Sequence, residues 1–108
     1  MPHDQRHKDL QKMLETACPD VFNWKKPVPL AIGIHQEISE ATGYSVDIVK
    51  EFLRFWTYRH AYLRAVISRK WRRSASGEKT TRVTPNDKEH AARTLADKMK
   101  RERESKDG

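Results

Sequence analysis

Apolar residues recur three and four positions apart in several stretches of the chain, which is the spacing of a helix with one buried face. The first stretch contains Leu10, Met13, Leu14 and Ala17. It predicts a helix over residues 5–17, which ends before Pro19 because proline cannot continue a helix. The second stretch predicts a helix that starts near Pro29–Leu30 and ends at Gly43, since glycine readily adopts the left-handed conformation at a helix end.

The segment between these two helices, VFNWKKPVP, contains two prolines, which forbid a regular helix and favour an extended loop. Three large apolar side chains, Val21, Phe22 and Trp24, are expected to hold this loop against the core. The loop is therefore predicted to be part of the folded domain.

A third helix has a well-marked start, because Ser45 is a favoured N-cap and Asp47 places a negative charge in the first turn. Its apolar stripe consists of Val49, Phe52, Leu53 and Trp56. If this helix continued in phase, Arg59 would fall inside the stripe, where an unpaired charge is costly. We therefore predict a break near Thr57–Tyr58, with Thr57 as a candidate N-cap for the next helix.

A fourth helix and a hairpin are expected after this break. The fourth helix is predicted to bury Leu63, Val66 and Ile67, and the break leaves Arg59 and Arg64 facing solvent. Residues 71–83 favour a short β-hairpin, with Ser76–Gly77 near its turn, because glycine tolerates the positive φ of tight turns.

A last helix is predicted to start at Thr84 as N-cap, with Pro85 at the first position and Asp87 at the third. Its apolar stripe contains Ala91, Ala92, Leu95 and Met99. The final residues are charged and have nothing to bury, so they are expected to fray. The predicted organisation is an extension with the start of the first helix over 1–9, one folded domain over 10–96 and a charged, frayed tail over 97–108.

Length and composition fit one soluble domain of 108 residues, with 36% hydrophobic and 34% charged residues. No apolar run has the length of about 20 residues that a membrane span needs, so no membrane partner is expected. The single cysteine, Cys18, excludes an internal disulfide and favours a reducing, cytoplasmic setting.

The location of the charge is more informative than the net value of +7. Residues 52–77 contain seven basic residues and no acidic one, which leaves 15 of the 22 basic residues to balance the 15 acidic residues elsewhere. The seven are Arg54, Arg59, Arg64, Arg69, Lys70, Arg72 and Arg73. A polyanionic partner is the simplest reason to concentrate charge in this way.

The sequence does not favour an enzyme or a bound cofactor. His3 and His7 have the spacing of two metal ligands on a helix, but no cysteine, acidic cluster or third histidine stands nearby, so no metal site is expected. The chain has no glycine-rich phosphate loop and no Gly-x-Ser-x-Gly motif.

Aromatic residues are interleaved with the basic ones, a combination typical of nucleic-acid binding. Arginine matches phosphate oxygens with a planar fork, and tyrosine offers a flat face on which a base can stack. Phe52, Phe55 and Trp56 have core spacing, whereas Tyr58 and Tyr62 are candidates for a ligand surface. Trp71 could cover the core edge or stack on a base.

The basic residues are spread over two predicted helices and a hairpin, instead of one exposed recognition helix as in a helix-turn-helix DNA reader. This distribution favours a surface that holds A-form RNA by shape. A DNA-binding module and an adaptor for an acidic protein remain as alternatives.

Five segments together resemble the ProQ/FinO RNA chaperones of bacteria. They are PLAIGI at 29–34, FLRFWT at 52–57, AYLRAV at 61–66, Arg72 followed by Gly77, and EHAARTL at 89–95. The resemblance covers roughly residues 10–96. It implies a compact, mainly α domain of about five helices with a small β-hairpin, without catalytic activity.

The resemblance also implies a function. Members of this family bind structured RNA, preferring the lower stem and U-rich 3′ tail of an intrinsic terminator, and they protect small RNAs and promote pairing with messages. By position, the RNA-contacting residues would be Lys50, Arg54, Tyr62 and Arg72, with Ser45 capping a helix whose start lies near the RNA. The remaining candidate contacts are Tyr58, Arg59, Arg64, Arg69, Lys70 and Arg73. A monomer is expected.

Some positions depart from the family pattern. Ala31 stands where a lysine is usual, Val46 where a basic residue is common, and Lys50 where an arginine is usual. Ser74 and Ser76 replace acidic residues of the hairpin.

Overall fold

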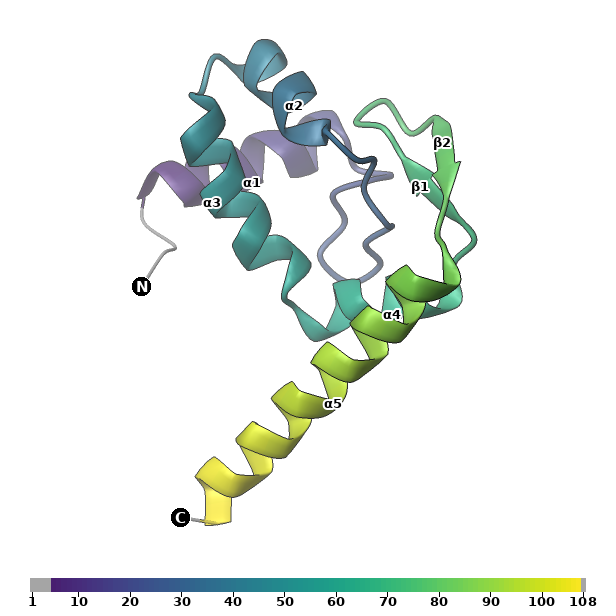
Figure 1. Ribbon diagram of the computed structural model, residues 1–108. Helices are drawn as coiled ribbons and strands as arrows, with labels where there is room; N and C mark the ends of the chain where they lie inside the picture. Colours follow the sequence, from purple (N-terminus) through teal and green to yellow (C-terminus); the bar gives the residue numbers. More distant parts are fainter. Residues whose placement is uncertain (1–4, 108) are drawn as a thin grey trace.

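The structure, a computed structural model, describes residues 5–107, and this part of the chain folds into helices around one small antiparallel hairpin (Figure 1). In chain order the elements are α1 (Gln5–Ala17), α2 (Ile34–Thr42), α3 (Val46–Thr57), α4 (His60–Ser68), β1 (Trp71–Arg73), β2 (Lys79–Arg82) and α5 (Pro85–Asp107). The predicted fold class, mainly helical with one hairpin, is confirmed. None of the helices in this range is both long and apolar enough to cross a membrane.

Helix α3 supplies the centre of the core. Its start is as predicted, since the backbone N–H of Ile48 donates to the Ser45 hydroxyl over 3.3 Å. Phe52 and Trp56 are fully buried, and Phe22 from the loop packs on them with ring centroids 6.3 and 5.3 Å away. Helix α1 covers the same core with Leu10, because the apolar face of each helix can be shielded from water only by another element.

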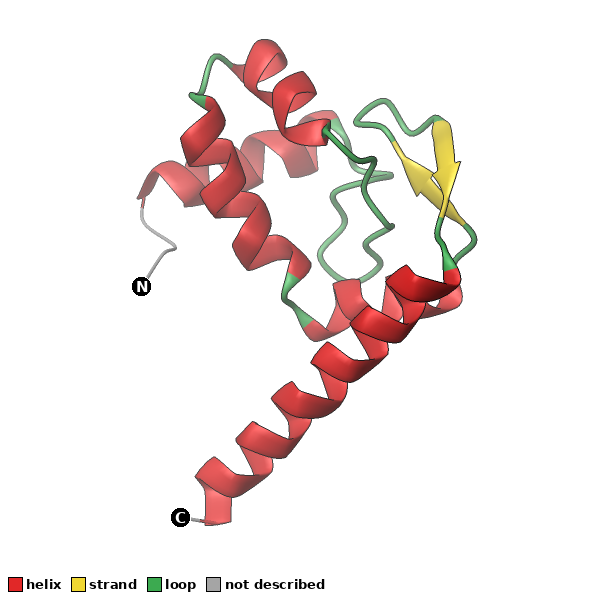
Figure 2. Cartoon of the chain, viewed as in Figure 1, coloured by secondary structure: helices red, strands yellow, loops and turns green. Residues whose placement is uncertain are grey.

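The loop between α1 and α2 lies between the helices and the hairpin (Figure 2), and its backbone bonds directly to β1. Arg73 donates its backbone N–H to the Pro29 carbonyl and accepts from the Ala31 N–H, both over 2.8 Å. This extended pairing is why α2 starts at Ile34, so the expected start near Pro29–Leu30 is wrong. Gly33, with φ of 84°, turns the chain into the helix.

The predicted break after α3 is confirmed, but Arg59 is placed differently from the expectation. Arg59, instead of Thr57, precedes the first turn of α4, and its guanidinium carbon lies 3.6 Å from the centre of the Trp24 ring and 4.4 Å from that of Trp56. It also donates to the carbonyl of Trp24. Its expected exposure to solvent is therefore wrong, because two aromatic faces and a carbonyl compensate for burial of the charge. Burial lowers the pKa of Arg59.

Helix α5 begins with a reciprocal cap. The Asp87 N–H donates to the Thr84 hydroxyl over 3.0 Å, and the Thr84 N–H donates to the Asp87 carboxylate over 3.1 Å. The side chain of Lys88 donates to three carbonyls at the end of α4 and ties the two helices together.

The expected frayed tail is not observed, because α5 continues to Asp107 and its second half projects from the domain (Figure 1). Burial ends early along this helix: Ala91 is buried, while Ala92 and Met99 are exposed. Polar contacts extend the packing, since His60 lies 3.1 Å from Glu102. The projecting half consists mostly of good helix formers.

Replacing Trp56 tests the role of α3 in the core. We expect Trp56→Ala to lower the free energy of unfolding by about 3–5 kcal/mol, because it leaves a large cavity and removes a face on which Arg59 stacks. Trp56→Phe is the control, since it keeps a ring and should cost only about 1–2 kcal/mol. Equal denaturation midpoints for both variants and the wild type would contradict this assignment of the core.

Candidate nucleic-acid interface

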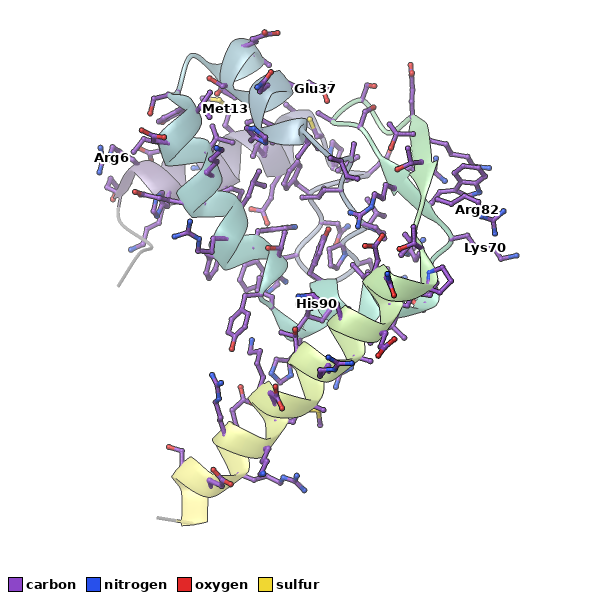
Figure 3. All side chains as sticks on the ribbon, viewed as in Figure 1. Arg6, Met13, Glu37, Lys70, Arg82 and His90 are labelled. Atoms are coloured by element: carbon purple, nitrogen blue, oxygen red, sulfur yellow. The ribbon has the colours of Figure 1, made fainter. Side chains whose placement is uncertain are left out.

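A groove of about 950 Å³ lies where α3, α4 and the start of α5 meet. We call it the α3–α5 groove. The polar and aromatic side chains that line it include Arg54, Tyr58, Tyr62, Arg72, Asp87 and His90. Figure 3 labels His90 on the side of α5 that is turned toward α3. Apolar side chains such as Phe55 and Leu63 complete the wall, so the groove offers both flat apolar surface and polar groups.

Helix α3 carries two exposed cations, and one of them lines this groove. Arg54 lines the groove and is exposed, and Lys50 is exposed one turn earlier on the same helix. Neither forms an ion pair with a carboxylate in residues 5–105, and the nearby Glu51 instead contacts His7 over 3.2 Å. Ser45 is exposed at the start of the same helix. These placements agree with the side chains predicted to be available to a polyanion.

Tyr58 is the aromatic side chain that the groove exposes most, with 45% of its surface accessible. The ammonium group of Lys98 lies 4.1 Å from the centre of its ring and donates to the Tyr58 carbonyl. Sequence patterns missed Lys98, because it is brought to Tyr58 by the packing of α5 against α4. Burial lowers the pKa of Lys98.

The expectation of an outward-facing Tyr62 is wrong. Tyr62 is 6% exposed, and its hydroxyl accepts a hydrogen bond of 3.0 Å from the Leu30 backbone N–H. Burial raises the pKa of this hydroxyl, and the neighbouring Arg72 partly opposes the rise. Tyr62 therefore forms part of the groove floor and fixes the loop onto α4.

Arg72 is likewise held inside the protein. Its guanidinium group pairs with Asp87 over 3.0 Å and donates to the Leu30 carbonyl over 2.9 Å. The interpretation of Arg72 as a free phosphate contact is therefore corrected: it joins the hairpin to the loop and to α5. The pKa of Asp87 is lowered, first by the hydrogen bond from the Thr84 backbone and then by Arg72.

The other predicted cations do not gather at the groove. Arg73 donates to the Gly77 carbonyl over 3.0 Å and so stabilises the hairpin turn. Arg64, Arg69 and Lys70 are exposed but do not line the groove. Of the seven cations of the acid-free segment, only Arg54 and Arg72 therefore line the groove.

Metal ligands do not cluster in the described part of the chain, where no three His, Cys, Asp or Glu side chains gather. His7 is buried in α1 beside Glu51, and His3 lies outside the described residues.

Replacing Arg72 separates a structural role from a binding role. We expect Arg72→Ala to lower the free energy of unfolding by about 1–3 kcal/mol, because the Leu30 carbonyl and Asp87 lose their partner. Arg54→Ala is the matched control, since an exposed arginine should change stability by no more than about 0.5 kcal/mol.

The stability at low pH provides a second test of the structural role of Arg72. The lowered pKa of Asp87 means that its contribution to stability is complete above the ordinary carboxyl pKa of about 3.9 and is lost as the pH falls through the lower folded value. The difference in the free energy of unfolding between the wild type and Arg72→Ala should therefore become smaller in strong acid. An Arg72→Ala variant with an unchanged melting temperature at neutral pH would refute the structural role.

Comparison with known proteins agrees with this architecture. A crystal structure of a FinO-like RNA chaperone from Neisseria meningitidis MC58 is similar, with a TM-score of 0.73, 18% sequence identity and coverage of 87% of this chain and 86% of that one. The solution structure of a ProQ homolog from Legionella pneumophila gives a TM-score of 0.70 at 19% identity, with coverage of 87% and 84%. No curated protein sequence gives a significant match.

At these identities the two structures establish the fold alone. The family model described as ProQ/FINO family matches residues 5–108, which is nearly the whole chain. This match confirms the resemblance seen in the five sequence segments. The chain therefore belongs to the ProQ/FinO family.

Proposed function

We propose that this protein binds structured small RNAs at the lower stem and U-rich 3′ tail of an intrinsic terminator, and that it supports their pairing with messages. The observation that carries the proposal is the α3–α5 groove, which is lined by an unpaired arginine, Arg54, and an exposed tyrosine, Tyr58. Family membership supports RNA as the ligand class.

The cations of α3 provide the electrostatic part of binding. Lys50 and Arg54 are one turn apart on one helix face, so they can contact successive phosphates of one strand. Both already lie in solvent without a carboxylate partner, so binding does not have to break an ion pair. The free N–H groups at the start of α3, beside Ser45, add a partial positive charge on the same helix.

The aromatic residues provide a place for unpaired bases. Tyr58 is exposed, and the ammonium group of Lys98 lies over its ring. An unpaired base could take the place of this ammonium group on the ring, and Lys98 would then be released to contact a phosphate. Tyr62 and Arg72 act indirectly here, since they hold the floor of the groove in place. Arg64, Arg69 and Lys70 contribute to the long-range attraction of a polyanion.

Competition between ligands tests this function. We expect a terminator hairpin RNA with its 3′ tail to displace a labelled RNA at lower concentration than duplex DNA of equal length at the same salt. The Lys50→Ser/Arg54→Ser variant should bind the RNA more weakly by about 1–3 kcal/mol for each lost contact. It should also have a salt slope of log K against log salt that is shallower by about 1–2 than that of the wild type.

The matched control removes the same charge elsewhere. Lys100→Ser/Arg103→Ser lies on the projecting half of α5, where both side chains are exposed, and should bind nearly as the wild type does. Equal loss of affinity in both double variants would mean that only net charge matters. Stronger competition by DNA, or binding only to an acidic protein, would contradict the proposal.

A further inference from the structure

The outer face of the hairpin carries a second group of cations around a tryptophan. Trp71 and Arg82 are paired across the two strands, and the guanidinium carbon of Arg82 lies 5.4 Å from the centre of the Trp71 ring. The ammonium group of Lys79 lies at the same distance of 5.4 Å. We call the set formed by Lys70, Trp71, Lys79 and Arg82 the hairpin patch.

The hairpin patch faces away from the groove. Arg72 points inward to Asp87, whereas the two side chains that lie over the Trp71 ring, Lys79 and Arg82, are exposed. None of the four residues of the patch lines the α3–α5 groove. Figure 3 shows Lys70 and Arg82 projecting from the hairpin on the side away from α3. The patch is therefore a separate surface.

Trp71 is not part of the hydrophobic core. It is absent from the side chains that form or border the core cluster, and the groups placed over its ring are the two cations. A large indole on the outer face of a hairpin, which exposed lysine and arginine side chains cover, is not needed for packing. Its flat face becomes available to a ligand when these mobile side chains move aside.

The cations of the hairpin patch have no carboxylate partner among residues 5–105. Lys70, Lys79 and Arg82 are all exposed, and none of them forms an ion pair within this range. The hairpin has one acidic residue, Glu78, beside its turn. The like charges of Lys79 and Arg82 lie over one ring and repel each other, so a polyanion bound there would relieve the repulsion. The flat face of the Trp71 indole can stack on an unpaired base. Single-stranded nucleic acid therefore fits the patch better than a duplex, whose bases are already stacked on one another.

We propose that the hairpin patch is a second RNA-contact surface, which holds a single-stranded segment beside the structured part of the ligand. Trp71 stacks on one base, and Lys79 and Arg82 move from the ring to the neighbouring phosphates. This inference rests on the proposed function in one respect, namely that the ligand is RNA. It adds a surface on the opposite side of β1 from the groove and predicts a preference for RNAs with unpaired flanks.

The test compares two RNAs with the full-length protein. One is a terminator stem with its 3′ tail, and the other carries an added unpaired 5′ extension of about ten nucleotides, within the range that one small binding site contacts. We expect the extension to raise wild-type affinity about tenfold, the scale of one base stacked on an aromatic side chain. Trp71→Ala and Lys79→Ser/Arg82→Ser should lose that gain and still bind the shorter RNA as the wild type does.

Three controls give each outcome a meaning. Trp71→Phe keeps a flat ring and should retain most of the gain, while Lys100→Ser/Arg103→Ser, with the same loss of charge, should retain all of it. An extension of abasic nucleotides keeps the phosphates but removes the bases, so it should give little gain. The Lys79→Ser/Arg82→Ser variant changes exposed side chains only, so its melting temperature should equal that of the wild type.

Failure of this inference differs from failure of the proposed function. If the extension raises affinity equally in the wild type, Trp71→Ala and Lys79→Ser/Arg82→Ser, the hairpin patch does not contact RNA, although the groove still does. An abasic extension that gives the full gain would also overturn stacking on Trp71. If the wild type binds neither RNA, the proposed function itself has failed.

Discussion

One guanidinium group connects four parts of the chain that are far apart in sequence. Arg72 on β1 bonds to the Leu30 carbonyl in the loop and to Asp87 at the start of α5, and it lies beside Tyr62 on α4, whose hydroxyl accepts from the same Leu30. A buried polar group that loses its hydrogen-bond partner destabilises the protein, so the members of this network fix one another's positions. The hairpin, the loop and α5 therefore keep one arrangement, and the floor of the α3–α5 groove is rigid.

This constraint divides the arginines and lysines into two classes. Arg59, Arg73 and Lys88 satisfy carbonyls or aromatic faces inside the fold, as Arg72 does. The exposed cations without a carboxylate partner include Lys50 and Arg54 on α3 and Lys79 and Arg82 on the hairpin, and these four are the ones that we propose contact RNA. The net charge therefore overestimates the number of cations that a ligand can contact, because some of the arginines and lysines form hydrogen bonds or ring contacts within the fold. The two exposed groups lie on opposite sides of β1, which suits a ligand longer than one stem end.

Patterns within a few residues of one another predicted most of the fold. The spacing of apolar residues gave α1 and α3, the caps at Ser45 and Thr84 were correct, and the cost of burying Arg59 indicated the break after α3. The start of α2 was missed because it depends on pairing between residues 29–31 and β1, a contact across about forty positions. Arg54 and Tyr58 are exposed at the groove, and their contact with RNA stays a prediction. The burial of Tyr62 and Arg72 depends on Leu30 and Asp87, which no local pattern connects to them.

The position of bound RNA on the protein is the most direct measurement of whether the α3–α5 groove is the primary binding surface. Ultraviolet crosslinking of a terminator RNA to the protein, followed by mass spectrometry of the crosslinked peptides, reports it residue by residue. The groove predicts crosslinks at Tyr58 and in the peptides of α3 and α5 that flank it, with the greatest yield from the uridines of the 3′ tail. Crosslinks confined to α1 and α2, with none at the groove, would contradict it.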